Sequence, residues 1–218
     1  MKQKTALIVG ATGLTGKSLL KYLLDAEAYE KVIVLTRKQI EVNSEKVKLI
    51  IIDFDKLSQY KEMLKADDVF CCLGTTIKKA KTKEAFKKVD WHYPVEIAQL
   101  TKVNGAQQFL VVSSMGANSK SSIFYSHVKG VMEAELQKIG FDALHIFRPS
   151  LLLGDRGEFR LGEYLGIAFY RLISWLFIGK LKKYKGIQAD TVARGMYRTA
   201  QLERKGINIY LSDEIAEM

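Results

Sequence analysis

The residues Gly10-Ala11-Thr12-Gly13-Leu14-Thr15-Gly16 form a glycine-rich segment that decides the fold of the whole chain. An apolar run at 5–9, typical of a short buried strand, precedes this segment. A helical pattern at 14–27 follows it, with Leu19, Leu20, Leu23 and Leu24 on one face. A glycine-rich turn between a strand and a helix is the arrangement that binds the pyrophosphate of a dinucleotide. The segment therefore predicts a dinucleotide-binding turn.

Each glycine of this turn has a separate task. Gly10 lets the chain turn sharply at the end of the strand, Gly13 lets the pyrophosphate approach the backbone, and Gly16 lets the helix pack closely on the sheet. The free N–H groups at the start of the helix then face the anion. The segment is not a P-loop, because Gly13 and Gly16 are too close together for that motif, although Lys17 and Ser18 imitate its ending.

Apolar runs and helical periods alternate along the rest of the chain. We expect further strands at 31–36, 47–52, 68–73, 108–113, 143–147 and 207–211, and further helices at 56–65, 82–104, 124–139, 163–178 and 190–201. Continuous apolar strands separated by helices indicate a parallel sheet that is covered on both faces. The predicted fold is α/β: a doubly wound parallel (Rossmann) sheet in a single NAD(P)-binding domain, 1–218. Within it, 155–205 is expected to form a small C-terminal lobe or lid on the substrate side.

The composition suits a globular protein of this class. The chain has 218 residues, a formal net charge of +10, and two cysteines, Cys71 and Cys72, which are adjacent and poorly placed to bond to each other. Without a disulfide framework or a charged-then-apolar leader, we expect a cytoplasmic location. No helix-turn-helix, zinc-finger or RNA-recognition signature accompanies the charge, so nucleic acid is not an expected partner. The three histidines are scattered, and no metal site is expected.

The end of the second predicted strand bears on the choice of cofactor. NAD-binding sites usually place an acidic residue here, which accepts a hydrogen bond from a ribose hydroxyl. This chain has Thr36-Arg37-Lys38 instead. A guanidinium at Arg37 would bind a 2′-phosphate, so NADP(H) is favoured over NAD(H).

A serine, a tyrosine and a lysine further along the chain suggest acid–base chemistry. Tyr125 and Lys129 lie one helical turn apart, where the ammonium would favour the phenolate form of the tyrosine and also hold a ribose. Ser114 ends the strand before this helix and would donate a hydrogen bond to a developing oxyanion. A Tyr-x-x-x-Lys spacing is common by chance, so the placement of the pair after Val111-Val112-Ser113-Ser114 matters more than the spacing.

At this point the chain resembles the atypical short-chain dehydrogenase/reductases. The resemblance rests on Gly-Ala-Thr-Gly-Leu-Thr-Gly, Leu-Thr-Arg-Lys, Val-Ser-Ser-Met-Gly-Ala, Tyr-x-x-x-Lys and Phe-Arg-Pro-Ser, in that order. Cys71-Cys72-Leu73-Gly74-Thr75-Thr76, Phe124-Tyr125 to Lys129-Gly130, and Arg148-Pro149 to Gly154-Asp155-Arg156 resemble, more narrowly, the Tat-interacting-protein-like oxidoreductases. The Asn-Asn-Ala-Gly motif of many superfamily members is absent, and Cys-Leu-Gly-Thr stands in its place.

The resemblance implies roles for individual residues. Catalysis would fall to Ser114 (Ser113 is the less favoured alternative), Tyr125 and Lys129. The cofactor would contact Gly10, Thr12, Gly13, Leu14, Thr15, Gly16, Arg37, Asp53, Phe54, Leu73, Gly74, Thr75, Lys129, Pro149 and Ser150. Of these, Asp53 and Phe54 match the loop that flanks the adenine, and Pro149 and Ser150 the loop beside the nicotinamide.

Three hypotheses about function follow. The first is an oxidoreductase that exchanges a hydride between NADP(H) and a small or lipophilic carbonyl or alcohol. The second is a cofactor-binding regulatory or sensor protein with little turnover. The third is a membrane-peripheral protein, since the apolar run 164–178 and the basic run 180–185 suit a membrane interface. The same apolar run equally suits a substrate pocket, a homodimer contact or packing against the domain.

Overall fold

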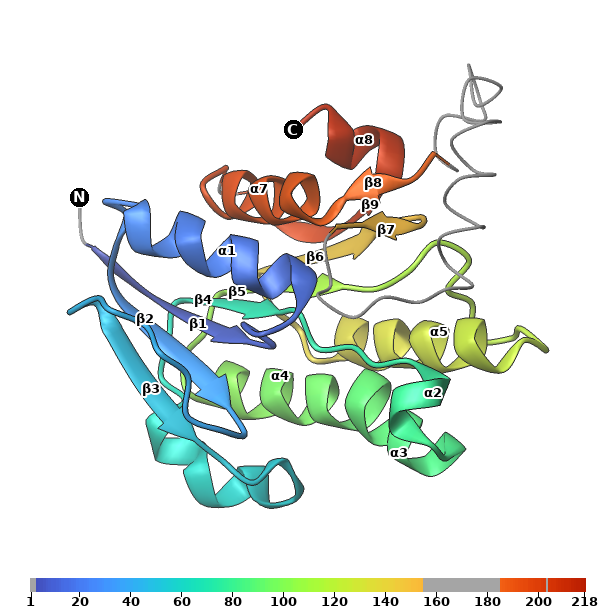
Figure 1. Cartoon of the computed structure of the whole chain (residues 1–218), viewed down its shortest axis with the longest axis horizontal. Helices are drawn as coiled ribbons and strands as arrows, with labels where there is room; N and C mark the ends of the chain where they lie inside the picture. The colour runs from blue at the N-terminus through green and yellow to red at the C-terminus, as the bar shows by residue number, and fades with distance from the viewer. Residues whose placement is uncertain (1–2, 155–184, 203) are drawn as a thin grey trace.

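A parallel sheet is the centre of the molecule. Among residues 3–154, 185–202 and 204–218, which the computed structural model describes, seven strands lie in the order β3-β2-β1-β4-β5-β6-β9 (Figure 1). Every neighbouring pair is parallel. The strands are β1 (Lys4–Val9), β2 (Tyr29–Thr36), β3 (Val47–Ile51), β4 (Asp68–Cys71), β5 (Gln108–Val112), β6 (Ala143–Arg148) and β9 (Gly206–Leu211). The strand order reverses between β1 and β4, where doubly wound sheets bind their ligands.

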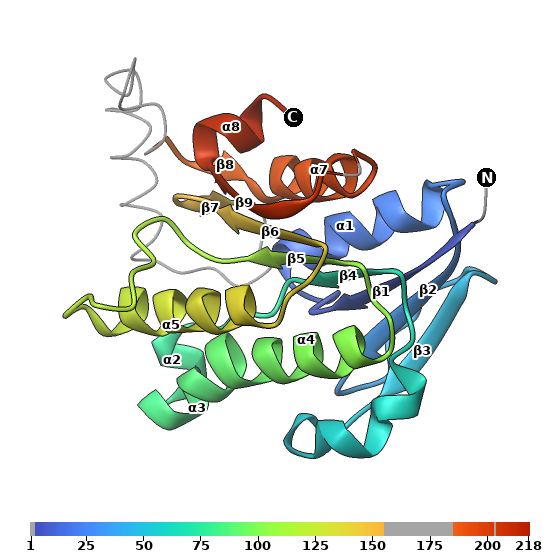
Figure 2. The same ribbon diagram turned by 180° about the vertical axis from the view of Figure 1, so that it is seen from behind.

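Helices cover both faces of this sheet (Figures 1 and 2). One face carries α1 (Leu14–Asp25), α7 (Ala189–Ala200) and α8 (Ser212–Ala216). The other side carries η1 (Phe54–Met63), α2 (Ile77–Ala80), α3 (Lys83–Lys87), η2 (Lys88–His92), α4 (Tyr93–Val103) and α5 (Phe124–Lys138). Two short strands, β7 (Leu152–Leu153) and β8 (Ile187–Gln188), pair separately.

The core consists of two apolar layers, one on each side of the sheet. In β1, Leu7 and Val9 belong to one layer and Ala6 and Ile8 to the other, because successive side chains point to opposite faces. All four residues are fully buried. The α/β fold with a doubly wound parallel sheet is therefore as the continuous apolar strands predicted.

The C-terminal segment differs in part from the expectation of a lobe at 155–205. Helix α7 packs beside α1, and Val192, Ala193 and Met196 belong to the same buried layer as β1. Strand β9 then extends the sheet beside β6. α7 is part of the layered core because one of its faces is apolar enough to cover the sheet. The predicted helix at 163–178 and the run 164–185, apart from Lys185, lie outside the described residues.

Two helical segments also differ from their predicted form. The segment expected as an α-helix at 56–65 is the 3₁₀ helix η1, which begins at Phe54. The helix expected at 82–104 contains a π-helical turn, η2, immediately before Pro94. Pro94 has no N–H to donate to the carbonyl of Asp90, and its ring would clash with that carbonyl in an α-helix. The wider turn avoids this clash and places Asp90 in the interior.

Candidate functional site

The predicted site residues follow the carboxyl ends of six neighbouring strands. Gly10 follows β1, Arg37 follows β2, and Asp53 stands two residues after β3. The other three positions continue across the sheet: Leu73 after β4, Ser114 after β5 and Pro149 after β6. In a parallel sheet these ends share one edge, where helix N-termini also converge. Sequence-distant residues therefore meet along one edge.

The glycine-rich turn fits a bound pyrophosphate. Helix α1 begins after Gly13 with no side-chain cap among the described residues and no acidic residue in its first turn. The first N–H groups of the helix thus face outward without a local carboxylate to compete for them. A Cβ on Gly16 would lie 2.1 Å from the carbonyl oxygen of Gly10, so only glycine fits there. Gly10 itself has a φ of +84° and lies against the backbone of Cys72, which brings the loop after β4 beside this turn.

The residues expected around the adenosine lie after β2 and β3, around Tyr93. Phe54 is buried, and its ring centroid lies 5.3 Å from that of Tyr93. Tyr93 donates a hydrogen bond of 2.8 Å to Asp55, and burial together with this bond raises the pKa of Tyr93 to about 12. Arg37 is exposed and close enough to act on Tyr93 electrostatically in the opposite direction. This group therefore combines the exposed guanidinium of Arg37 with the packed rings of Phe54 and Tyr93.

A buried acidic side chain, Asp90, binds the backbone of the loop after β4. The N–H of Thr75 donates to Asp90 Oδ2 at 2.8 Å. A Cβ on Gly74 would lie 3.6 Å from Asp90 Oδ1. The loop that contains Leu73, Gly74 and Thr75 thus begins against Gly10 of the glycine-rich turn and continues over Asp90.

Lys129 is buried and ion-paired. Its Nζ lies 2.8 Å from Asp90 Oδ1 and 3.5 Å from the carbonyl oxygen of Val112, the last residue of β5. Tyr125, one turn earlier on α5, is 39% exposed and packs against the ring of Phe86. Helix α5 therefore carries an exposed tyrosine and a buried ammonium, and the ammonium lies next to the end of β5.

The two serines after β5 are in different environments. Ser113 donates a hydrogen bond to Glu133, which also binds Arg148 through Nε at 3.0 Å. Ser114 is buried, and its hydroxyl has no hydrogen-bond partner within the described ranges. A buried hydroxyl without a partner is costly unless a ligand satisfies it. Of the two serines, Ser114 is thus the one whose hydroxyl is left unpaired among the described residues.

The loop after β6 closes this part of the site. The carbonyl of Pro149 accepts the N–H of Met115 at 2.9 Å, which joins this loop to the one that carries Ser114. The N–H of Ser150 donates to the hydroxyl of Ser212 at 2.7 Å. Pro149 and Ser150 therefore lie close to the loop that carries Ser114.

Two buried carboxylates beside the candidate site were missed by sequence reasoning. Asp90 is 1% exposed and Glu133 is 2% exposed. The sequence offered one sign of each, because both stand on a helix face that is otherwise apolar. Asp90 is four residues after Phe86, and Glu133 lies between Met132 and Leu136. A carboxylate at such a position is rarely left unpaired, so it indicates a buried cation nearby.

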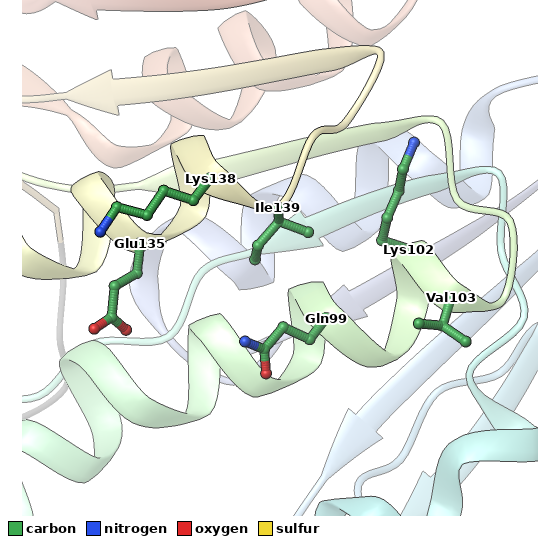
Figure 3. Close-up of a pocket in the computed structure, with 6 residues that line it drawn as sticks. All are labelled: Gln99, Lys102, Val103, Glu135, Lys138 and Ile139. Atoms are coloured by element: carbon green, nitrogen blue, oxygen red, sulfur yellow. The ribbon is translucent and has the colours of Figure 1, made fainter.

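A surface groove lies elsewhere, between the C-terminal ends of α4 and α5 (Figure 3). Its volume is about 580 Å³, and it is lined by Gln99, Lys102, Val103, Glu135, Lys138 and Ile139. Helices in this fold run antiparallel to the strands, so these ends lie toward the amino edge of the sheet. The groove therefore contains none of the predicted site residues.

Neither a metal cluster nor a spanning helix is found in the described ranges. No group of three or more His, Cys, Asp and Glu side chains there is arranged to hold a metal ion. None of the helices in those ranges has the length and apolar character needed to cross a bilayer.

Comparisons with known proteins concern the family and the fold of the chain. Residues 6–127 match the model of the NAD dependent epimerase/dehydratase family. Protein HTATIP2 of Rattus norvegicus is 41% identical over 78% of this chain and 72% of its own length. Protein FMP52, mitochondrial, of Candida albicans is 35% identical over 97% of this chain and 93% of its own length. The WbmH enzyme of Bordetella bronchiseptica, solved in complex with NAD+, has the same fold, with a TM-score of 0.70 at 16% identity over 95% of this chain and 75% of WbmH.

The comparisons also correct one expectation. The sequence patterns suggested a cytoplasmic location, but several fungal relatives are named as mitochondrial proteins. This finding overturns the cytoplasmic expectation. Cysteine usage is a poor guide here, since it reports only that thiols stay reduced.

Proposed function

The chain belongs to the NAD dependent epimerase/dehydratase family, and on that basis we propose that it is an NADP(H)-dependent oxidoreductase acting on a small or lipophilic carbonyl or alcohol. The observation that carries this proposal is the convergence of Ser114 and Lys129 at the carboxyl end of β5. Ser114 offers a buried hydroxyl that has no partner among the described residues, and the Nζ of Lys129 lies 3.5 Å from the last carbonyl oxygen of that strand.

The proposed roles follow from these positions. Tyr125 is exposed enough to exchange a proton with the oxygen of a substrate at its phenol oxygen. Ser114 donates a hydrogen bond to the same oxygen as negative charge develops on it. Lys129 holds the hydroxyls of the nicotinamide ribose and adds positive charge near the phenol. When bound, the dinucleotide supplies the hydride to the carbonyl carbon, or removes it from the alcohol.

The preference for NADP(H) over NAD(H) is a second part of the proposal. Arg37 is exposed at the end of β2, and Thr36-Arg37-Lys38 contains no carboxylate that would repel a 2′-phosphate. The solved structure of WbmH, which has the same fold, is a complex with NAD+, so the preference proposed here rests on residues of the present chain. A charge-assisted bidentate contact to Arg37 would provide the discrimination.

Titration of NADPH and NADH tests the cofactor, with cofactor fluorescence as the readout. We expect Arg37→Ala to weaken NADPH binding by roughly tenfold to a hundredfold and to leave NADH binding within about twofold. Lys31→Ala is the matched control, since it removes one charge at the opposite end of β2. Equal affinity for both cofactors, unchanged by Arg37→Ala, would refute the NADP(H) preference.

Oxidation of NADPH at 340 nm with a panel of carbonyls and quinones tests the reaction. Tyr125→Phe should lower the rate by about 10² to 10⁴, because proton transfer is lost while the ring remains. If the wild type binds NADPH but oxidises it no faster than Tyr125→Phe on any carbonyl, the oxidoreductase proposal fails. A cofactor-binding regulatory protein is then the hypothesis that remains.

A further inference from the structure

The ion pair between Asp90 and Lys129 is the feature of the site that the proposed roles leave unexplained. The two charged atoms lie 2.8 Å apart, and the side chains are 1% and 4% exposed. Asp90 reaches this position from the π-helical turn η2, a local irregularity in an otherwise α-helical segment. Such turns often occur at functional sites. The pair is therefore built by the fold and is not a chance surface contact.

The second oxygen of Asp90 has a different partner. Asp90 Oδ2 accepts the N–H of Thr75 at 2.8 Å, while Oδ1 binds the ammonium of Lys129. One carboxylate thus connects the loop after β4 to helix α5. In the proposed function, that loop lies beside the adenine-side ribose, and Lys129 holds the nicotinamide ribose.

We propose that Asp90 is a positioning residue that holds Lys129 and the Gly74–Thr75 loop in one fixed arrangement for the two riboses of the dinucleotide. This inference rests on the proposed cofactor site and deepens it. Asp90 acts on the cofactor through Lys129 and Thr75, and it makes no contact with the reacting atoms.

The electrostatics around Lys129 support this role. Burial by itself lowers the pKa of Lys129, but the facing charge of Asp90, with smaller effects from Tyr125 and Cys71, raises it above its ordinary value. Cys71 faces the lysine as a neutral thiol, since burial raises the pKa of Cys71 to about 11. Asp90 is therefore the residue that keeps the buried lysine charged.

A double-mutant cycle separates positioning from a general effect on the fold. NADPH affinity is measured for the wild type, Asp90→Asn, Lys129→Met and the double variant. Asparagine keeps an oxygen that can accept the N–H of Thr75 but removes the charge that faces Lys129. We expect Asp90→Asn to weaken NADPH binding about tenfold in the wild-type background and less than about twofold in the Lys129→Met background.

The contact with Thr75 has its own test. Asp90→Ala removes the acceptor for Thr75 as well, so it should weaken binding further in both backgrounds. If Asp90→Ala and Asp90→Asn bind equally in the Lys129→Met background, the part of the proposal that concerns Thr75 is wrong.

Asp68→Asn is the matched control. Asp68 is also 1% exposed and ion-paired, to Lys4 at 3.3 Å, but it begins β4 at the opposite edge of the sheet. The substitution Asp68→Asn should leave NADPH affinity unchanged.

A nitrogen-15 NMR titration of the Lys129 ammonium in the cofactor-free protein gives a readout independent of binding. The pKa of Lys129 should fall in Asp90→Asn and stay unchanged in Asp68→Asn.

Three results would overturn the inference. They are an equal loss of affinity from Asp90→Asn in both backgrounds, no loss in either, or an unchanged pKa of Lys129. If Asp90→Asn does not fold, the double variant Asp90→Asn/Lys129→Met replaces it, because that variant has neither buried charge. Its NADPH affinity is then compared with that of Lys129→Met. Equal affinity then supports the inference, and a tenfold difference overturns it. Failure of the wild type to bind NADPH would instead refute the proposed function, while the NMR titration would still report on the ion pair.

Discussion

Arg148 and Glu133 form an ion pair at the carboxyl end of β6, in which Arg148 Nε lies 3.0 Å from Glu133 Oε1 and 3.2 Å from Oε2. Glu133 also accepts a hydrogen bond from the hydroxyl of Ser113. Helix α5, the end of β5 and the end of β6 are thereby joined through one carboxylate. This arrangement occupies the hydroxyl of Ser113, whereas the hydroxyl of Ser114 has no partner within the described part of the chain.

Glu133→Gln should lower the free energy of unfolding by about 3 kcal/mol, because the charge of Arg148 would lose its buried partner. Urea unfolding followed by circular dichroism measures the change. Glu62→Gln is the matched control, since the pair of Glu62 and Lys65 is mostly exposed and should contribute less than about 1 kcal/mol. Equal effects of the two substitutions would mean that the Glu133 network does not stabilise the fold.

The substitutions of the two serines after β5 should differ in their effects: Ser113→Ala should mainly lower stability, and Ser114→Ala should mainly lower turnover. Ser113→Ala removes a buried hydrogen bond and should cost about 1 kcal/mol of stability. Ser114→Ala removes a hydroxyl that is unpaired in the described structure, so stability should stay within about 0.5 kcal/mol, while the proposed turnover falls by about 10²-fold. Urea unfolding and NADPH oxidation together distinguish the two serines. A larger loss of stability in Ser114→Ala than in Ser113→Ala would contradict this assignment.

Alanine substitutions at two glycines of the turn after β1 should differ in their effects on stability and on NADPH binding. Gly13 has a φ of −77°, which alanine adopts freely, and its Cβ would lie 3.3 Å from the carbonyl oxygen of Gly10. Gly13→Ala should therefore fold with a change of at most about 1 kcal/mol, yet bind NADPH at least about tenfold more weakly, because the methyl group fills the approach to the pyrophosphate.

In Gly16→Ala the new Cβ would lie 2.1 Å from the same carbonyl oxygen. The backbone must move to relieve this overlap, which should cost roughly 3 kcal/mol. Thermal unfolding and NADPH titration of both variants check the contrast. Normal NADPH binding by Gly13→Ala would refute the place assigned to the pyrophosphate.

His145 should make the fold sensitive to acid. It is fully buried, and burial, with a smaller effect of Arg204, lowers the pKa of His145 to about 4, against about 6.5 for an unfolded histidine. Between these values the unfolded chain binds more protons than the folded one. Stability should therefore fall as the pH decreases from about 6.5 to 4, by up to about 1.4 kcal/mol per pH unit from this residue.

Urea unfolding across this pH range measures the effect. His145→Gln should flatten the pH dependence between pH 4 and 6.5. His92→Gln is the control, since His92 is exposed and its replacement should leave the slope unchanged. A slope that persists in His145→Gln would assign the acid sensitivity to another group.

Much of the site follows from local sequence. The glycine-rich segment after an apolar run predicts a strand, a turn and a helix, and alternating apolar strands predict a parallel sheet. In such a sheet the carboxyl ends of the strands share one edge, so residues such as Arg37, Ser114 and Pro149 can be assigned to that edge without coordinates. The spacing of Tyr125 and Lys129 also places them on one helical face.

Tertiary structure decided which charges and hydroxyls are paired. The π-helical turn before Pro94 directs Asp90 toward Lys129, and the packing of α5 directs Glu133 toward Arg148 and Ser113. Likewise α7 covers the sheet, although its sequence suited a peripheral lobe. Helical and strand periods report which residues share a face, because they arise from backbone geometry. Contacts between residues distant in sequence arise only when the layers pack. The sequence therefore determined which edge of the sheet holds the glycine-rich turn, whereas packing determined the partners of the residues beside that turn.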